Sequence, residues 1–526
     1  MTPVQILDST LRDGAQAEGI SFSVNDRLEL ARILDGLGLH YIEAGNPASN
    51  PKDLAFFRQA RELKLRRAKL CAFGATRRKG SAADADKSCA ALLEANTPAV
   101  AIVGKGSSLH VDEVLKTTPA ENLAMIEDTC RFFARAGREV IFDAEHFFDG
   151  YALDPAYALE TLRAAARGYA RVLVLCDTNG GAFPWQAAEI TRKVCGEFPG
   201  CAIGIHAHDD GGMATAISCA AVEAGARHVQ GTLLGFGERV GNAGLSAVIP
   251  NLQLKLGYAC VEPGQLASLT QYALRAASVA NTRLRGGTPF VGASAFAHKG
   301  GMHADGVLKN PASFEHIDPA AVGNRRRVLV GEMAGRAAVL PRVQRLYPDI
   351  GADDPALERI VAALKDRELG GYSYEGADAS FDLLIRRSRE TLPAFFELIS
   401  YKVLDQLPYQ GERSATATLR LRADGRVKTA EARGEGPVNA LDLALRGALR
   451  AFYPALARVR LIDYKVRIMD SAAGTGSRVR VLITSGDGAR QWTTVGVSHD
   501  IIEASWEALA DSIVYILLND YKIDGK

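Results

Sequence analysis

The sequence predicts an α/β protein that begins with a closed barrel of eight parallel strands and continues into a mostly helical region and a C-terminal α+β domain. Two observations predict the barrel. Short, nearly continuous apolar runs alternate with segments of helical apolar spacing, which is typical of a parallel sheet covered on both faces. Eight such runs fit a (β/α)8, or TIM, barrel. The runs are residues 4–7, 41–44, 69–73, 100–103, 140–143, 172–176, 202–205 and 228–232.

The segments between the runs support this alternation. Residues 27–37 and 121–136 carry apolar side chains at helical spacing. A doubly wound open sheet is the alternative fold. It is less favoured because no Gly-x-Gly-x-x-Gly turn follows the first run.

Composition limits the domain count and the classes of function. At 526 residues the chain is too long for one core, and we expect a barrel over 1–263, helical linker subdomains over 264–405 and an α+β domain over 406–526. The net charge of +1 gives no argument for nucleic acid or an acidic membrane surface as a partner. The N-terminus lacks a basic and then apolar leader, and no apolar run reaches the ~18 residues of a membrane helix, so we expect a cytoplasmic protein. Eight cysteines without a Cys-x-x-Cys pair indicate reduced thiols rather than structural zinc.

Barrel enzymes carry their catalytic groups at the carboxyl ends of the strands. Polar side chains follow many of the predicted strands here, which indicates one site assembled from separate strands. They are Asp13 after the first run, Glu43 after the second, Asp143 and Glu145 at the fifth, residues 177–179 after the sixth, His206 and His208 after the seventh and residues 235–242 after the eighth.

The strongest of these signals is the pair His206 and His208. Side chains at i and i+2 of a strand share a face, so the two imidazoles point the same way and a divalent metal is their natural shared partner. Taken alone, the pair could equally be two ordinary polar loop histidines. With Asp13 and Asn242 they make an octahedral set with open positions, which suits Mg²⁺ or Mn²⁺, and also Zn²⁺. The open positions could chelate the 2-oxo group and carboxylate of a substrate, whose carbonyl the metal would polarise.

Two further side chains have both a functional and a structural interpretation. Arg12 could stabilise a developing enolate or alkoxide, or form a salt bridge to Glu43 or Glu145, or both. Thr178 could hydrogen-bond a substrate carboxylate or simply pack at the end of its strand.

Aromatic and basic residues near the strand ends are also open to two interpretations. Phe73, Phe147 and Phe148 could fill the pocket so that only a small 2-oxo acid fits, or they could be lid or core packing. The basic residues 77–79 could meet the phosphates of a coenzyme, although a solvated basic turn is favoured.

Beyond residue 257 the strand rhythm stops, and 264–400 has mostly helical spacing. Residues 298–306 interrupt it with paired glycines beside His303 and Asp305, which predicts a mobile loop that brings polar groups to a ligand, or else a plain interdomain turn.

The C-terminal part changes pattern again and predicts a loose internal repeat of strands followed by a helix. It has no obvious acid–base cluster, so we expect a ligand-binding or dimerising domain. Its predicted elements are strand 415–421, turn 423–425, helix 437–453, strands 459–468, 478–484 and 492–497, and helix 501–518.

Three motifs together resemble a known family. Residues 7–16 (LDSTLRDGAQ), 206–209 (HAHD) and 237–243 (GERVGNA) are similar to signatures of the 2-isopropylmalate, homocitrate and citramalate synthase family of metal-dependent lyase-like TIM barrels. Residues 49–53, 142–151 and 315–319 resemble its citramalate branch. Residues 436–442 and 494–498 resemble its regulatory domain, which binds a branched-chain amino acid.

The resemblance implies a Claisen condensation of acetyl-CoA with a 2-oxo acid, pyruvate in the citramalate branch, in isoleucine synthesis. It also implies feedback inhibition by isoleucine and a homodimer. The site residues that follow are Arg12, Glu145 and His303 as catalytic groups, with His303 as general base, then Gln16, Thr178, Asp143, Asp305 and Phe73 for substrate, and Asp13, His206, His208 and Asn242 for the metal.

The sequence departs from the family pattern at three places. Asp209 stands where the family usually has Asn, Phe314 where it usually has Tyr, and Asn46-Pro47-Ala48 where the branch usually carries a Trp-containing segment. Three alternatives therefore stay open: the same reaction on a larger 2-oxo acid, a retro-aldol acyl-CoA lyase, and a ligand-responsive binding protein.

Overall fold

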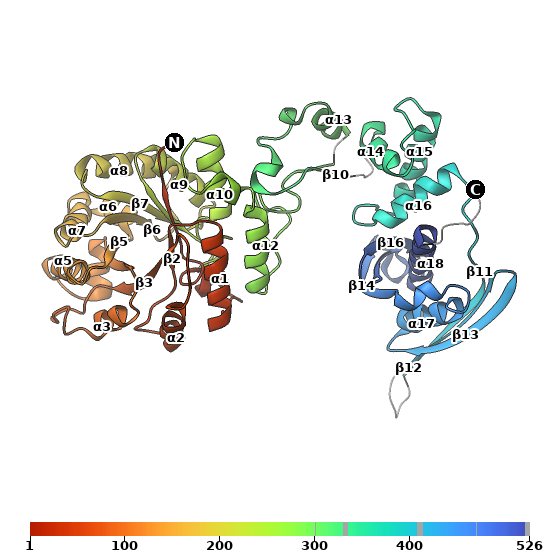
Figure 1. Cartoon of the computed structure of the whole chain (residues 1–526), viewed down its shortest axis with the longest axis horizontal. Coiled ribbons are helices and arrows are strands. Elements are labelled where there is room, and N and C mark those ends of the chain that lie inside the picture. Colours follow the sequence, from red (N-terminus) through yellow and green to blue (C-terminus); the bar gives the residue numbers. More distant parts are fainter. Residues whose placement is uncertain (300, 330–334, 408–413, 470, 521–526) are drawn as a thin grey trace. The chain divides into compact units, whose positions relative to one another are not determined.

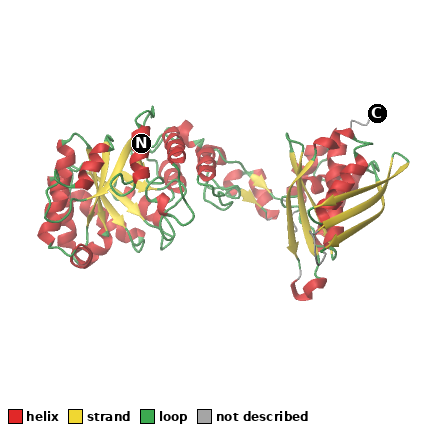
Figure 2. Cartoon of the chain, turned by 90° about the horizontal axis from the view of Figure 1, so that it is seen from below, coloured by secondary structure: helices red, strands yellow, loops and turns green. Residues whose placement is uncertain are grey.

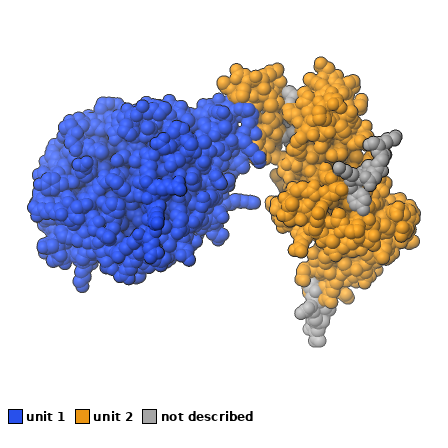
Figure 3. Space-filling view, viewed as in Figure 1, with its two compact units in different colours: residues 1–296, 315–326 blue, residues 297–314, 327–526 orange. Residues whose placement is uncertain are grey.

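The computed structural model describes residues 1–299, 301–329, 335–407, 414–469 and 471–520. The chain separates into two compact units, which Figure 3 colours separately. The first unit holds residues 1–296 and 315–326, and the second holds 297–314 and 327–526. The three-part division predicted from the sequence, with boundaries at 263 and 405, stays a prediction.

The first unit is built on a closed barrel of eight parallel strands in sequential order (Figures 1 and 2). Strand β1 pairs with β2 on one side and with β8 on the other, where Gln5 lies opposite His228, and this pairing closes the barrel. The predicted TIM barrel is confirmed. Its strands are β1 (Gln5–Asp8), β2 (Tyr41–Glu43), β3 (Lys69–Ala75), β4 (Ala99–Lys105), β5 (Glu139–Glu145), β6 (Val172–Asp177), β7 (Ala202–Ala207) and β8 (His228–Gly231).

Helices surround the barrel, and local sequence sets where several of them begin. Ser23 and Asp26 cap α1 reciprocally, each side chain accepting a hydrogen bond from the other's backbone N–H. Thr118 caps α5, with Pro119 at its first position. The helices of this unit are α1 (Val24–Gly36), α2 (Pro51–Ala60), α3 (Lys87–Glu94), α4 (Ser108–His110), α5 (Pro119–Arg135), α6 (Phe147–Leu153), α7 (Pro155–Arg167), α8 (Pro184–Glu197), α9 (Ala214–Glu223), α10 (Leu245–Pro250), α11 (Pro263–Leu266) and α12 (Leu269–Val279).

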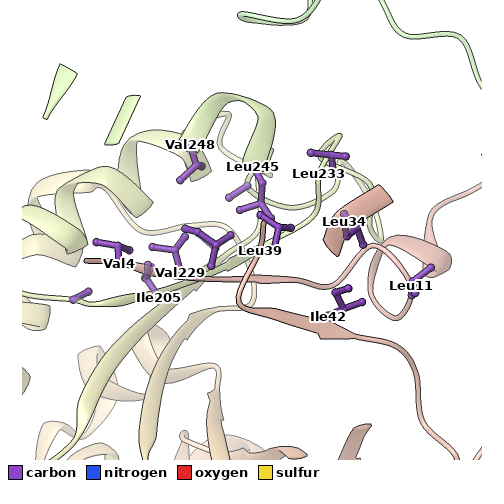
Figure 4. Packing of buried hydrophobic residues seen from close by; sticks show 14 of the residues in the cluster. Val4, Leu11, Leu34, Leu39, Ile42, Ile205, Val229, Leu233, Leu245 and Val248 are labelled. Carbon is purple, nitrogen blue, oxygen red and sulfur yellow. The ribbon is translucent and has the colours of Figure 1, made fainter. Parts of the chain in front are cut away.

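Alternate residues of the strands supply two apolar layers. In β4, Val100 and Ile102 belong to the large cluster between strands and helices, while Ala99 and Ala101 belong to the cluster that fills the barrel. Figure 4 shows part of the outer cluster, with Ile205 close to residues of the neighbouring elements. Because apolar side chains bury both faces of the strands, the polar side chains of the site lie mainly at the strand ends.

The second unit opens with helices around a small core that includes Ala304, Val339 and Leu357. The loop predicted over 298–306 is wrong for the residues from Gly301 onward, which form α13 and carry His303. Ala304 and Val307 are buried on one face of this helix, and Asp305 pairs with Lys309 one turn later at 2.7 Å. The elements are β9 (Ala297–His298), α13 (Gly301–Lys309), β10 (Arg327–Val328), α14 (Arg336–Leu346), α15 (Pro355–Leu369) and α16 (Asp378–Arg389).

The rest of the second unit consists of two three-stranded antiparallel sheets, each followed by a helix, so the predicted α+β repeat is confirmed. One assignment was wrong: the helical region was predicted to reach residue 405, but residues 397–406 form β11 and pair along β12. The repeat is thus more regular than the sequence suggested. Its elements are β11 (Glu397–Gln406), β12 (Ser414–Ala423), β13 (Arg426–Gly434), α17 (Pro437–Leu449), β14 (Arg460–Ile468), β15 (Val479–Gly486), β16 (Gln491–Ser498) and α18 (Ile501–Asp520).

Among the described residues, no helix combines the length and apolar character needed to cross a bilayer.

Candidate active site

The carboxyl ends of the barrel strands surround a cavity of about 560 Å³. Most of the residues predicted for the site line this cavity. They are Arg12, Asp13, Gln16, Phe73, Asp143, Glu145, Thr178, His206 and His208.

Asp13, His206 and His208 form a buried cluster whose ligand atoms all lie within 4.8 Å of one another. The Nε2 atoms of His206 and His208 lie 3.8 and 3.9 Å from Oδ2 of Asp13. This spacing is too long for hydrogen bonds and leaves room for one ion among the three atoms. These residues could therefore hold a metal ion.

Asn242 lies beside this cluster and provides a test of whether the residues fit a metal. Its amide nitrogen donates to Oδ1 of Asp13 at 3.0 Å and to the carbonyl of Phe236 at 3.1 Å. Its Oδ1 atom is buried and has no hydrogen-bond partner among the described residues. A buried amide oxygen left without a donor is costly, and a divalent cation is a partner that would satisfy it. A carboxylate, two imidazoles and an amide oxygen therefore fit the proposed ion.

The loop after β8 holds Asn242 in place through close backbone packing. A bridge pairs Asn242 with His208 at the end of β7. Gly241 has φ +99°, and a Cβ there would lie 1.9 Å from the carbonyl oxygen of Gly235. A Cβ at Gly237 would lie 2.2 Å from the Asn242 amide nitrogen. Only glycine fits at these two positions.

Arg12 is held between two carboxylates at the rim of the cluster. Its Nη1 donates to Asp13 at 2.8 Å, its Nε donates to Glu43 at 2.8 Å, and its guanidinium carbon lies 4.1 Å from the centre of the Phe73 ring. Burial would raise the pKa of Asp13, but Arg12 and the two histidines lower it to about 2. Of the two salt-bridge partners considered from the sequence, Arg12 pairs with Glu43, and it also lines the cavity.

Burial has different effects on the other titratable groups. It lowers the pKa of His208 to about 4, with help from His206, so this imidazole is neutral and able to bind a metal. It raises the pKa of Asp143 to about 8, with a further contribution from Glu43.

Two residues of the site were missed from the sequence, Gln230 and Lys105. Gln230 of β8 contacts both His206 and Asp143. Lys105, at the end of β4, lines the cavity and forms an ion pair with Glu145. Both occupy strand-end positions, which is the signal that could have identified them.

The structure bears on the alternatives left open for Thr178 and for the aromatic residues. The Thr178 hydroxyl accepts a hydrogen bond from the backbone N–H of His146 at 2.8 Å, so its own proton remains for a ligand. Phe147 and Phe148 belong to the hydrophobic core and do not line the cavity, whereas Phe73 does.

The basic turn at residues 77–79 serves the fold. Arg77 is buried and pairs with Glu121 at 2.8 Å and with Asp128 at 2.9 Å. The ammonium group of Lys79 donates to the carbonyls of Leu115 and Lys116. The favoured interpretation as a solvated turn was therefore wrong for Arg77.

His303 and Asp305 are not among the residues that the cavity brings together. Both lie on α13 of the second unit, where the His303 ring stacks on Phe314 with their centres 4.4 Å apart. Their assigned roles stay predictions.

Three family models match successive parts of the chain. Residues 3–273 match the family model described as HMGL-like, residues 290–368 match the homocitrate synthase post-HMGL domain-like model, and residues 375–517 match the LeuA allosteric (dimerisation) domain. The chain is 49% identical to an (R)-citramalate synthase of Aquifex aeolicus over 98% of both chains. It is 48% identical to one from Synechocystis, over 98% of this chain and 96% of that protein. A 2-isopropylmalate synthase of Shouchella clausii is 30% identical over 98% of this chain and 96% of that protein.

The parallel barrel, with its histidine–carboxylate cluster at the carboxyl ends of the strands, belongs to the HMGL-like class, because residues 3–273 match that family model. At its C-terminus the chain carries a domain of the LeuA allosteric (dimerisation) type. Within that class, its full-length similarity shows that the chain belongs to the (R)-citramalate synthase family.

Proposed function

We propose that this protein condenses acetyl-CoA with pyruvate to give (R)-citramalate and CoA, the first step of a pyruvate route to isoleucine. The observation that carries the proposal is the 44–49% identity to (R)-citramalate synthases from four organisms over nearly the whole chain. The methyl carbon of the thioester loses a proton to a base and forms a bond to the 2-oxo carbon, whose oxygen gains a proton. Water then cleaves the thioester C–S bond and releases the thiol of CoA.

The cavity offers groups suited to the charged oxygens of the substrate and of the developing enolate or alkoxide. Arg12 is a fixed cation at the rim, suited to the negative charge that develops on an enolate or alkoxide oxygen. Lys105 and the free proton of Thr178 are suited to the carboxylate of the 2-oxo acid. Phe73 lies under Arg12 and limits the space beside it.

Asp13, His206, His208 and Asn242 would hold a divalent ion, with Mg²⁺ or Mn²⁺ favoured over Zn²⁺ by the oxygen donors. When bound, the ion supplies Lewis acidity that polarises the 2-oxo carbonyl. We keep His303 as the proposed general base, with Asp305 beside it on α13.

The C-terminal domain supports a proposal about assembly and control. Its similarity to the LeuA allosteric (dimerisation) domain supports a homodimer whose activity a small ligand controls, and isoleucine as feedback inhibitor is the proposed ligand. A monomer by size-exclusion chromatography with light scattering would refute the dimer. The cytoplasmic location stays a prediction.

The proposal is tested by measuring release of free thiol from acetyl-CoA with Mg²⁺ or Mn²⁺ across a panel of 2-oxo acids. We expect a clear preference for pyruvate. A preference for 2-oxoisovalerate would retain the chemistry and replace the substrate, as the similarity to 2-isopropylmalate synthase would then suggest. Formation of acetyl-CoA from an acyl-CoA would indicate a lyase, and silence across the panel would refute a condensing enzyme.

A further inference from the structure

Gln230 lies inside the barrel on β8, directly opposite His206 of β7 in the parallel register. It is fully buried, and both polar atoms of its side chain are engaged. Its Oε1 lies 2.8 Å from Nδ1 of His206, and its Nε2 donates to Oδ1 of Asp143 at 2.9 Å. Because Gln230 lies between His206 and Asp143, its orientation determines which nitrogen of His206 carries the proton.

Two hydrogen bonds define which way the Gln230 amide faces. Its Nε2 donates to Oδ1 of Asp143, and its amide oxygen therefore faces Nδ1 of His206. An oxygen can only accept, so Nδ1 of His206 carries the proton.

This proton fixes the tautomer of the imidazole. With its proton on Nδ1, His206 presents the lone pair of Nε2, the atom that lies 3.8 Å from Asp13 Oδ2 within the cluster. The other histidine differs, because Nδ1 of His208 is buried without a hydrogen-bond partner among the described residues. Gln230 therefore selects, for His206 alone of the two histidines, the tautomer whose Nε2 can bind a metal.

We propose that Gln230 is a positioning residue of the metal site. Asp143 orients the Gln230 amide, and the amide oxygen holds His206 in the Nδ1-protonated tautomer, which raises the affinity of the site for a divalent ion. The inference rests on the metal site of the proposed function but not on the identity of the substrate. Partners of this kind typically change metal affinity by about 10- to 100-fold.

The test compares three variants by Mn²⁺ binding, measured from the electron paramagnetic resonance signal of free Mn²⁺. Gln230→Leu removes both hydrogen bonds, and we expect Mn²⁺ affinity to fall about 10- to 100-fold. Gln230→Glu keeps an acceptor for Nδ1 of His206, so it should retain most of the affinity that Gln230→Leu loses.

Gln253→Leu is the matched control, because Gln253 is also a buried glutamine of this unit. Among the described residues, the hydrogen bonds of its amide are to the backbone of Cys260 and Val261. We expect it to lower thermal stability and leave Mn²⁺ affinity unchanged. This control therefore distinguishes the effect of losing any buried amide from the effect of losing the hydrogen bond to His206.

The outcomes distinguish this proposal from the proposed function. Wild-type affinity in Gln230→Leu, or equal losses in Gln230→Leu and Gln230→Glu, would overturn the role of Gln230. Wild-type protein that binds Mn²⁺ but releases no thiol from acetyl-CoA would refute the proposed reaction and leave the Mn²⁺ comparison standing. If Gln230→Leu does not fold, Gln230→Glu still decides, since a large loss of affinity in that variant overturns the proposal.

Discussion

Replacement of Gly237 by alanine gives the sharpest test of the loop that carries Asn242. The added Cβ would lie 2.2 Å from the Asn242 amide nitrogen and 3.1 Å from Oδ1 of Asp13. An ordinary van der Waals contact begins near 3.4 Å, so the amide would have to move by about 1 Å. That movement breaks the 3.0 Å hydrogen bond to Asp13 and displaces a proposed ligand.

A displacement of about 1 Å at a reacting centre costs on the order of 100-fold in rate, or roughly 2.7 kcal/mol of transition-state stabilisation. We therefore expect Gly237→Ala to lower kcat for thiol release from acetyl-CoA by about this factor and to weaken Mn²⁺ binding. Gly244→Ala is the matched control. It lies in the same loop at φ −74°, and the nearest atom to its new Cβ would be 3.7 Å away.

The assay is the initial rate of thiol release at saturating substrates, with melting temperature and circular dichroism to confirm folding. Gly244→Ala should stay within about twofold of wild type, since its Cβ makes only ordinary contacts. If Gly237→Ala also stays within twofold in rate and in Mn²⁺ affinity, then either Asn242 is no ligand or the loop yields freely, and the reasoning fails.

Three other predictions concern charge, pH and metal. Burial lowers the pKa of His228 to about 3, from 6.5 when exposed, so the ring stays neutral in the folded state. The unfolded state binds the proton more readily, and the protein therefore loses folding stability as the pH falls below about 6.5. Between pH 7 and 5.5 this group should lower the free energy of unfolding in urea by about 1.3 kcal/mol. In His228→Leu the decrease over the same pH range should be smaller by that amount, and an equal decrease in the two proteins would exclude His228 as its source. Lys105→Met should raise the KM for the 2-oxo acid at least about tenfold, because the charge of Glu145 is then left without its partner in the cavity. An unchanged KM would show that Lys105 does not bind the substrate. Dialysis against EDTA should abolish thiol release and leave circular dichroism unchanged, because the pairing of β1 with β8 along the backbone closes the barrel, and Mn²⁺ should restore the rate. Activity that survives complete metal removal would refute the metal site.

The sequence predicted the barrel and most of the cavity lining because both depend on short-range patterns. Continuous apolar strands, followed by Asp13, Glu145 and the two histidines, place those side chains at one end of a barrel once the strands are parallel. Arg12 was also found this way. Its pairing with Glu43 was one of two alternatives, because the sequence does not show which strand ends are neighbours.

The failures share a physical cause, which is that tertiary partners decide between local options. The glycine-rich stretch with His303 forms a helix because one face is buried and Asp305 pairs with Lys309. Strand β11 depends on pairing with β12, a partner later in the sequence. Phe147 lies beside the predicted site in sequence yet packs into the core.

Gln230 was missed for a related reason. A single glutamine in an apolar strand carries no motif, and its role depends on His206 and Asp143, which lie 24 and 87 residues away in the sequence. The same holds for Lys105, whose partner Glu145 lies 40 residues further along the chain.

The hydrogen bond between Asn242 and Asp13 joins residues 229 positions apart, at the seam where β8 meets β1. Bringing such distant segments together carries a large loop-closure entropy, so contacts of this kind slow folding. The four proposed ligands come together only when the last strand has returned to the first. The ability to retain a metal ion is therefore a reporter of complete folding, and a nascent or truncated chain that lacks β8 has no assembled site to offer.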